Sequence, residues 1–174
     1  EIEDMKAPGI VKSGWQEVQA AADRYYRPGE FTTFAGFEFT SQPDYGNLHR
    51  VVLFRSSSRP ELPFGAMDST NPEDLWAWLD ASRDEGMDGL AIPHNSNLSD
   101  GLMFQLTDFD GNPITSEYAQ TRMRNEPIVE MTQVKGTSDT HPCHLNTSHH
   151  APQKDKSPHG RRPTPQKQTT SNTT

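Results

Sequence analysis

Apolar side chains near the start of the chain recur with the spacing of a helix. Between residues 13 and 26 they fall three and four positions apart, from Trp15 to Tyr25, which places them on one face. Ser13 stands where an N-cap residue is expected. The spacing therefore predicts a helix over 13–26 that begins at Ser13.

Two stretches that follow have the composition of β-strands. Residues 31–40 are rich in phenylalanine and threonine, and residues 49–55 contain a run of branched and aromatic side chains. The polar segment 42–47 between them, which contains proline and glycine, predicts a turn. We therefore expect two strands that form a hairpin or lie as neighbours in a sheet.

A second helix and two further strands are predicted later in the chain. Asn71, followed by proline and two acidic residues, marks the start of a helix over 71–85. The apolar stretches 89–93 and 127–134 predict strands, and the polar segment 98–125 predicts a loop. Because helices alternate with strands, we expect an α/β fold with parallel strands. Functional groups gather beyond the carboxyl ends of strands in such folds.

Composition divides the chain after residue 142. Residues 1–142 contain 11 Lys+Arg and 23 Asp+Glu, a net charge of −12, whereas residues 143–174 contain 5 and 1, a net charge of +4. The second segment has only three apolar side chains. These bury too little surface to offset a backbone entropy of about 1–2 kcal/mol per residue. We expect a domain over 1–142 and a disordered C-terminal tail over 143–174.

Three explanations of the tail stay open. They are a basic arm for nucleic acid, a histidine-rich metal-binding tract, and a segment without a selected function, such as a frameshift product. The abrupt change in composition favours the last. The acidity of residues 1–142 argues against nucleic-acid binding by the domain. The chain has no run of 18 apolar residues, so we expect no membrane span.

Several side chains suited to metal binding lie near the expected strand ends. Glu38 stands among aromatic residues, His49 opens the second strand, and His94 directly follows the strand over 89–93. Each has an ordinary alternative: a solvated carboxylate, a surface or capping histidine, and a hydrogen-bonded loop histidine. Asp139 and His141 lie two positions apart, so an extended backbone points them the same way. Together, these carboxylates and imidazoles would suit Zn²⁺, Mn²⁺ or Fe.

Four segments carry a resemblance to a known family. They are Phe-Ala-Gly-Phe-Glu-Phe-Thr at 34–40, Asn-Leu-His-Arg at 47–50, Ala-Ile-Pro-His-Asn-Ser at 91–96 and Val-Glu-Met-Thr-Gln-Val-Lys-Gly at 129–136. In this order they resemble the domain-of-unknown-function (DUF) 3604 family over roughly residues 10–142. That family is similar to the PHP (polymerase and histidinol phosphatase) superfamily, a distorted β/α barrel with metal ions at the strand ends. The resemblance thus implies an α/β fold in the form of an incomplete PHP-like barrel.

The resemblance also implies roles for the matching residues. Glu38, His49 and His94 are the expected metal ligands. Arg50 and Asn95, each next to a histidine in the sequence, are expected to face the anionic group of the substrate.

Other matches to the superfamily's pattern are partial. Glu130 is expected to contact the metal ligands without binding the ion itself. Asp139 and His141 have the form of the superfamily's closing Asp-x-His motif. The opening His-x-His motif has no counterpart, because no histidine precedes His49. The chain therefore looks like a fragment of a larger domain. The fragment keeps about half of the superfamily's metal ligands.

The function implied by the resemblance is metal-dependent hydrolysis of a small phosphate ester or another anionic ester. In a complete relative, two or three divalent ions would lower the pKa of a bridging water and stabilise charge on the ester. We expect weak or no activity from this chain alone. A non-catalytic acidic binding module and a truncated gene product without an independent fold stay open as alternatives.

Overall fold

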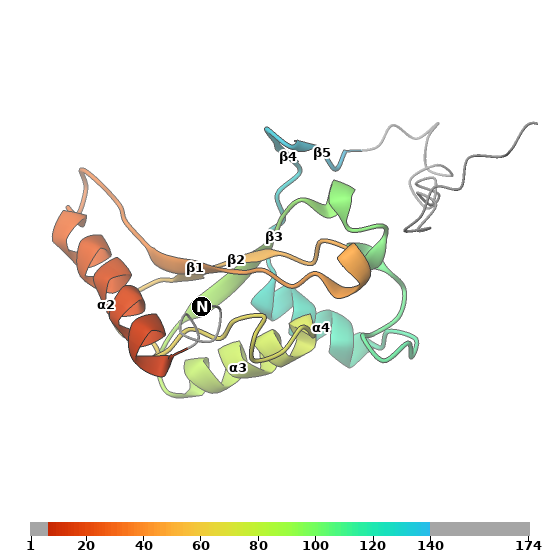
Figure 1. Ribbon diagram of the computed structural model, residues 1–174, viewed down its shortest axis with the longest axis horizontal. Helices are drawn as coiled ribbons and strands as arrows, with labels where there is room; N and C mark the ends of the chain where they lie inside the picture. Colours follow the sequence, from red (N-terminus) through yellow and green to blue (C-terminus); the bar gives the residue numbers. More distant parts are fainter. Residues whose placement is uncertain (1–6, 140–174) are drawn as a thin grey trace, which may run out of the picture.

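Three short strands from separate parts of the chain form the sheet that carries the candidate site (Figure 1). The computed structural model describes residues 7–139. The helices and strands in this range are α2 (Pro8–Tyr25), β1 (Ala35–Phe39), β2 (Arg50–Phe54), α3 (Pro72–Asp84), β3 (Gly89–Pro93), α4 (Ser116–Asn125), β4 (Thr132–Gln133) and β5 (Gly136–Thr137). The sheet order is β1-β2-β3, and β4 pairs with β5 in a separate hairpin.

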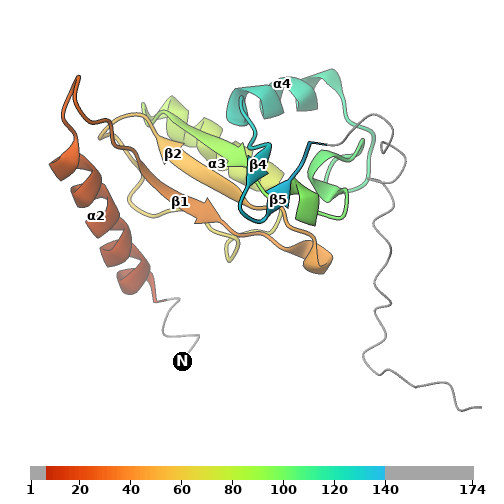
Figure 2. The same ribbon diagram turned by 90° about the horizontal axis from the view of Figure 1, so that it is seen from above.

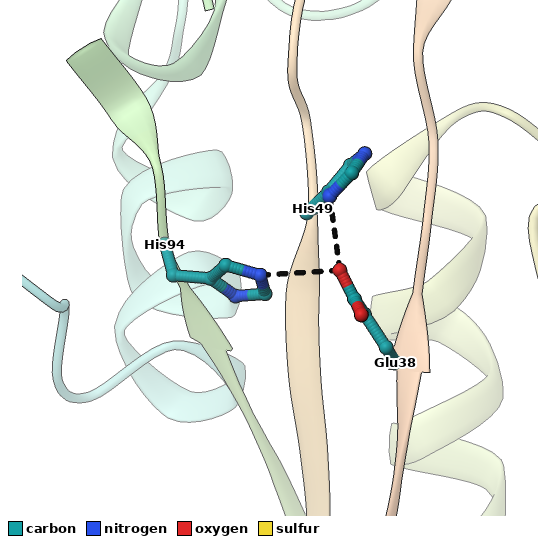
Figure 3. Close-up of side chains that lie close together, drawn as sticks. All are labelled: Glu38, His49 and His94. Carbon is teal, nitrogen blue, oxygen red and sulfur yellow. Dashed lines mark hydrogen bonds and ion pairs between the residues drawn. The ribbon is translucent and has the colours of Figure 1, made fainter. Parts of the chain in front are cut away.

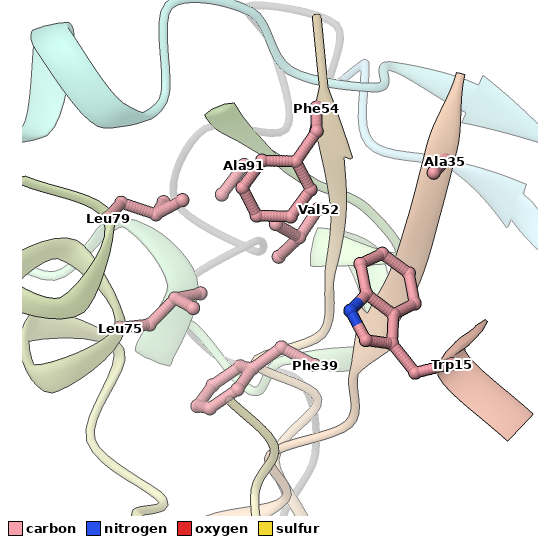
Figure 4. Packing of buried hydrophobic residues seen from close by; sticks show 8 residues of the cluster. All are labelled: Trp15, Ala35, Phe39, Val52, Phe54, Leu75, Leu79 and Ala91. Atoms are coloured by element: carbon pink, nitrogen blue, oxygen red, sulfur yellow. The ribbon is translucent and has the colours of Figure 1, made fainter. Parts of the chain in front are cut away.

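One face of the sheet packs against α2 and α3, and the main core lies there (Figure 4). Val52 and Phe54, two positions apart on β2, point to this face and are buried. Trp15 of α2 and Leu75 and Leu79 of α3 belong to the same cluster. Burial of one such side chain contributes about 1.5–3 kcal/mol, so this cluster fixes the strands against the helices.

The opposite face of the sheet is only partly covered. Val51 of β2 and Ile92 of β3 point to it and are half-buried. The β4–β5 hairpin lies on this side, over the end of the sheet at which β3 finishes (Figures 1 and 2). A backbone hydrogen bond from Glu130 N to Pro93 O (3.0 Å) links the segment before the hairpin to β3.

The helix predicted over 71–85 is confirmed as α3. Asn71 caps it, because its Oδ1 accepts a hydrogen bond from Glu73 N (2.8 Å). Gly86, just past the helix, has a φ of +85°, which suits a glycine at the end of a helix. The strands predicted over 31–40 and 49–55 are confirmed with narrower bounds as β1 and β2, and the strand predicted over 89–93 is confirmed with the same bounds as β3.

The predicted start of the first helix is wrong. α2 begins at Pro8 after Ala7, because proline at the first helical position has the φ that a helix needs and no N–H to satisfy. Ser13 lies inside the helix, and its hydroxyl donates a hydrogen bond to Ile10 O (3.0 Å). Its side chain therefore satisfies a carbonyl of the helix instead of capping the helix start.

The expectation of parallel strands is also wrong for the residues described. β1 and β3 both run antiparallel to β2. After β2, the loop over 55–70 returns along the sheet, and Ser41, just after β1, donates a side-chain hydrogen bond to Thr70 O. α3 then runs back to the end at which β2 finished, where Gly89 pairs with Phe54. In a parallel crossover, a helix carries the chain back along the sheet so that the next strand runs in the same direction. Here the loop over 55–70 carries the chain back, and α3 then reverses it, so β3 begins at the end at which β2 finished.

The strand predicted over 127–134 is wrong except at Thr132–Gln133, which form β4. Ile128, Val129 and Met131 are more than a third exposed, so the core does not take up this apolar stretch. The loop predicted over 98–125 is wrong at its end, which forms α4. Thr115 caps that helix by accepting from Tyr118 N (3.2 Å).

The tail over 143–174 lies outside the described residues, so its expected disorder stays a prediction. The barrel implied by the resemblance also stays a prediction. No helix among residues 7–139 is long and apolar enough to cross a membrane.

Candidate metal centre

Glu38, His49 and His94 come together on the partly covered face of the sheet (Figure 3). Strand register explains why, because Glu38 of β1 and Ile92 of β3 both pair with Val51 of β2. His94 and His49 continue this row beyond the paired ends, joined by the hydrogen bond from His94 N to His49 O (3.2 Å). Strand β1, the residue before β2 and the residue after β3 thus each contribute one side chain to the same face.

The three side chains are as close as ligands of one metal ion. Glu38 Oε1 lies 2.9 Å from His49 Nδ1 and 3.2 Å from His94 Nε2, and one ligand atom from each residue falls within 4.8 Å of the others. Ligands about 2.0–2.1 Å from a tetrahedral ion stand about 3.4 Å apart. The observed separations between Glu38 and the histidines are close to that value.

His94 is oriented as metal-binding histidines usually are. Its side chain is about nine-tenths buried, and Nδ1 lies 3.4 Å from Ile92 O, an acceptor toward which only a protonated Nδ1 can donate. With the ring proton on Nδ1, the Nε2 lone pair faces Glu38 Oε1, and a metal ion bound to both atoms would satisfy them. With the proton on Nε2, the ring donates a hydrogen bond to Glu38 Oε1 instead.

His49 is buried with unused ring nitrogens. Its Nδ1 is near Glu38 Oε1, but the oxygen is poorly aligned for a hydrogen bond, and Nε2 has no partner among the described residues. Burial lowers the pKa of His49, against the opposing effect of Glu38, and the charges of His94 and Lys135 lower it further. A neutral imidazole with an unused nitrogen is the form that binds metal.

Asn95 follows His94 in a left-handed backbone conformation, with φ of 56° and ψ of 34°. Its side chain is 2% exposed, and neither Oδ1 nor Nδ2 has a hydrogen-bond partner among residues 7–139. A buried amide without partners costs about 1–3 kcal/mol. Unpaired groups and backbone strain of this kind concentrate at binding sites. Asn95 thus fits its expected role toward a substrate, which stays a prediction.

The sequence was also compared with known proteins. The family model described as "Protein of unknown function (DUF3604)" matches residues 1–173. The chain belongs to the DUF3604 family. No curated protein matches the chain, and no solved structure matches it. The matched range continues past residue 142, where the composition of this DUF3604 chain changes.

Arg50 lies on the other face of the sheet, as expected for the residue after His49 in an extended segment. Its guanidinium is 2% exposed, donates from Nε to Glu126 Oε1 (2.8 Å) and donates from Nη1 to Leu48 O. Burial lowers the pKa of Arg50, and the carboxylate of Glu126 opposes this effect. Arg50 therefore has a carboxylate partner already, and its expected contact with a substrate stays a prediction.

The side chains of the remaining candidates do not belong to the Glu38–His49–His94 cluster within the part of the chain that the structure describes. Glu130 is half-buried and accepts a hydrogen bond from Gln133 Nε2. Asp139 is exposed, and its backbone N–H donates to Thr137 Oγ1 (3.1 Å). His141 lies outside the described residues, so the proposed Asp-x-His pair stays a prediction.

Sequence reasoning missed Glu126, whose carboxylate is 2% exposed in this DUF3604 domain. It accepts hydrogen bonds from Arg50 Nε, Trp76 Nε1 and Arg122 Nε. The sequence carries no signal for this role, since an acid before a proline at a helix end is ordinarily solvated. Lys135 belongs to the segment 129–136 that carries the resemblance, and its charge is the smallest of the causes that lower the pKa of His49.

Proposed function

We propose that the Glu38–His49–His94 cluster binds a divalent metal ion and that the domain hydrolyses phosphate or other anionic esters there. The observation that carries the proposal is the pairing of one carboxylate oxygen with two mostly buried imidazoles. His49 Nε2 has no other partner in the described part of the chain. A mixed N and O ligand set suits Zn²⁺, Mn²⁺ or Fe.

The exposure of Glu38 supports a catalytic site over a purely structural one. Its side chain is 48% exposed, whereas those of His49 and His94 are about 10% and 9% exposed. Three protein ligands leave a position open on the solvent side, as catalytic sites require. A bound ion would lower the pKa of a coordinated water and offset charge developing on the ester.

Neighbouring groups of the chain position the two imidazoles and offer a hydrogen-bond donor to the substrate. The backbone bond between His94 and His49 holds the two imidazoles on adjacent strands. The amide of Asn95, next to His94 in the sequence, is buried without a partner among the described residues, and we expect its Nδ2 to donate to an oxygen of the ester. Three candidate ligands lie together within residues 7–139. Since the superfamily that the chain resembles uses more, we expect slow turnover.

Metal titration of matched variants tests the proposal. Zn²⁺ and Mn²⁺ binding to the full chain is measured by calorimetry, and hydrolysis of an aryl phosphate ester is measured with the better-bound ion. We expect about one ion per chain, with metal affinity lowered about tenfold or more in Glu38→Gln and His94→Gln. Glu85→Gln, a charge-matched change at an exposed residue after α3, should leave metal affinity unchanged.

The outcomes separate metal binding from catalysis. Metal affinity that survives both ligand variants would contradict the ligand assignment. Tight metal binding without any measurable hydrolysis of phosphate, carboxylate or sulfate esters would contradict the hydrolase part and leave a metal-binding module. Hydrolysis that is equal with and without metal would contradict the role of the ion.

A further inference from the structure

The β4–β5 hairpin is fastened to the segment that follows His94. Asn97 Nδ2 donates to Lys135 O (3.4 Å), and Asn97 N donates to Ser138 Oγ (3.2 Å). Gly136 lies so close that a Cβ there would be 2.7 Å from Asn97 Nδ2. The position therefore favours glycine, and the hairpin turn packs against the chain just beyond the metal cluster.

Figures 1 and 2 show where this hairpin lies relative to the sheet. Both views place it across the sheet from α3, over the end at which β3 finishes. Glu38, His49 and His94 project from that face and that end. The hairpin is thus the element of the described chain that overhangs the cluster.

Lys135, in the two-residue turn of this hairpin, brings a positive charge to the cluster. The residue is exposed, and none of the ion pairs within residues 7–139 includes it. Its backbone carbonyl accepts the hydrogen bond from Asn97, three residues after His94, so the turn carries the ammonium on the side of the sheet where the cluster lies. Arg50, by contrast, points to the other face and is paired with Glu126.

An anionic substrate needs such a charge here. Residues 1–142 carry a net charge of −12, which repels anions from the surface as a whole. A divalent ion held by Glu38 leaves only one net positive charge at the cluster. A phosphate monoester with about two negative charges therefore needs another cation, which a flexible lysine can supply.

We propose that Lys135 holds the anionic group of the ester bound at the Glu38–His49–His94 cluster, the role that the resemblance assigned to Arg50. This inference rests on the proposed function. The β4–β5 hairpin is then the substrate-binding element of the domain. The ammonium contacts oxygens of the substrate that do not bind the ion, so Lys135 acts on substrate affinity and leaves metal affinity unchanged.

Inorganic phosphate tests the assignment directly. Its affinity for the metal-loaded full chain is measured by calorimetry, together with the KM for an aryl phosphate. In Lys135→Gln we expect the Kd for phosphate and the KM to rise about tenfold or more, the loss expected for one hydrogen bond to a charged group. Lys135→Arg should recover most of the affinity. Lys12→Gln, at a half-exposed lysine of α2 that pairs with Glu61, is the control and should equal the wild type.

Each result bears on one claim or on both. Metal binding with unchanged phosphate affinity in Lys135→Gln would overturn this inference alone, and so would a metal-loaded wild type that binds no phosphate. Loss of metal from Lys135→Gln would also overturn it, since the lysine would then act on the metal site. A wild type that binds no metal would overturn the proposed function and this inference together.

Discussion

Replacement of Glu126 by alanine should destabilise the fold strongly. The side chains of Arg50 and Glu126 are each 2% exposed, and Arg50 Nε lies 2.8 Å from Glu126 Oε1. The same carboxylate accepts from Trp76 Nε1 (2.8 Å) and Arg122 Nε (3.0 Å). The substitution would leave the Arg50 guanidinium charged and unpaired in the interior. Removal of one partner from a buried pair costs about 3–5 kcal/mol in the free energy of unfolding.

Urea unfolding, followed by far-ultraviolet circular dichroism and tryptophan fluorescence, measures this loss. Glu126→Gln keeps an acceptor oxygen but removes the charge, so we expect a smaller loss of about 1.5–3 kcal/mol. Glu85→Ala, at an exposed residue, is the control and should change stability by less than about 0.5 kcal/mol. A loss below about 1 kcal/mol in Glu126→Ala, with an unchanged m-value, would show that the buried Arg50 does not need this carboxylate.

The same substitution should also weaken the proposed metal site. Arg50 Nη1 donates to Leu48 O, so the pair with Glu126 holds the backbone immediately before His49. We expect Glu126→Ala to lower metal affinity under conditions in which the variant is still folded. Unchanged metal affinity would show that β2 holds His49 without this support.

Three further predictions concern the cap, the sheet and pH. Asn71→Ala removes the bond to Glu73 N and should lower the unfolding free energy by about 1 kcal/mol, seen as a lower Tm. Gly36→Ala would place a Cβ 2.5 Å from Val52 O and should cost about 1–3 kcal/mol, whereas Gly14→Ala, in open space on α2, should add about 0.5–1 kcal/mol. The pKa of His49 is lowered from 6.5 in the folded protein, so the unfolded chain binds a proton at this histidine first as the pH falls. The unfolding free energy of the metal-free protein should therefore decrease below about pH 6.5. His49→Gln should reduce this dependence of the unfolding free energy on pH, measured by urea unfolding at several pH values.

The sequence was most informative where one local signal determines one element. The cap at Asn71 and the apolar spacing after it predict α3, and β-branched and aromatic runs predict β1 and β2. The helix α4 was missed because its charged surface gives little apolar periodicity. Its boundary signals are present, with Thr115 as a cap and two arginines in the last turn.

Strand direction could not be predicted from the order of elements. It depends on the loop over 55–70, whose path is fixed by contacts such as Ser41 to Thr70 that are distant in sequence. The strand predicted over 127–134 was wrong for a different reason, which concerns the exposed segment 127–131. An apolar stretch becomes a strand only when a neighbouring strand and a core receive it, and composition shows neither.

The candidate ligands were identified as separate residues, and their proximity came from the register. Glu38 and His94 meet because both strands pair with β2 around Val51, which the sequence does not state. The burial of Arg50 against Glu126 could not be predicted for the same reason. The residue types indicated the chemistry, while the face on which each side chain lies required the sheet.

A crystal structure of the full chain grown with Zn²⁺, with anomalous diffraction measured at the zinc edge, tests the proposed metal site most directly. We expect an anomalous peak about 2.0–2.2 Å from ligand atoms of Glu38, His49 and His94. If saturating zinc gives no peak between these three side chains, or a peak bound by other residues, the cluster is not the metal site.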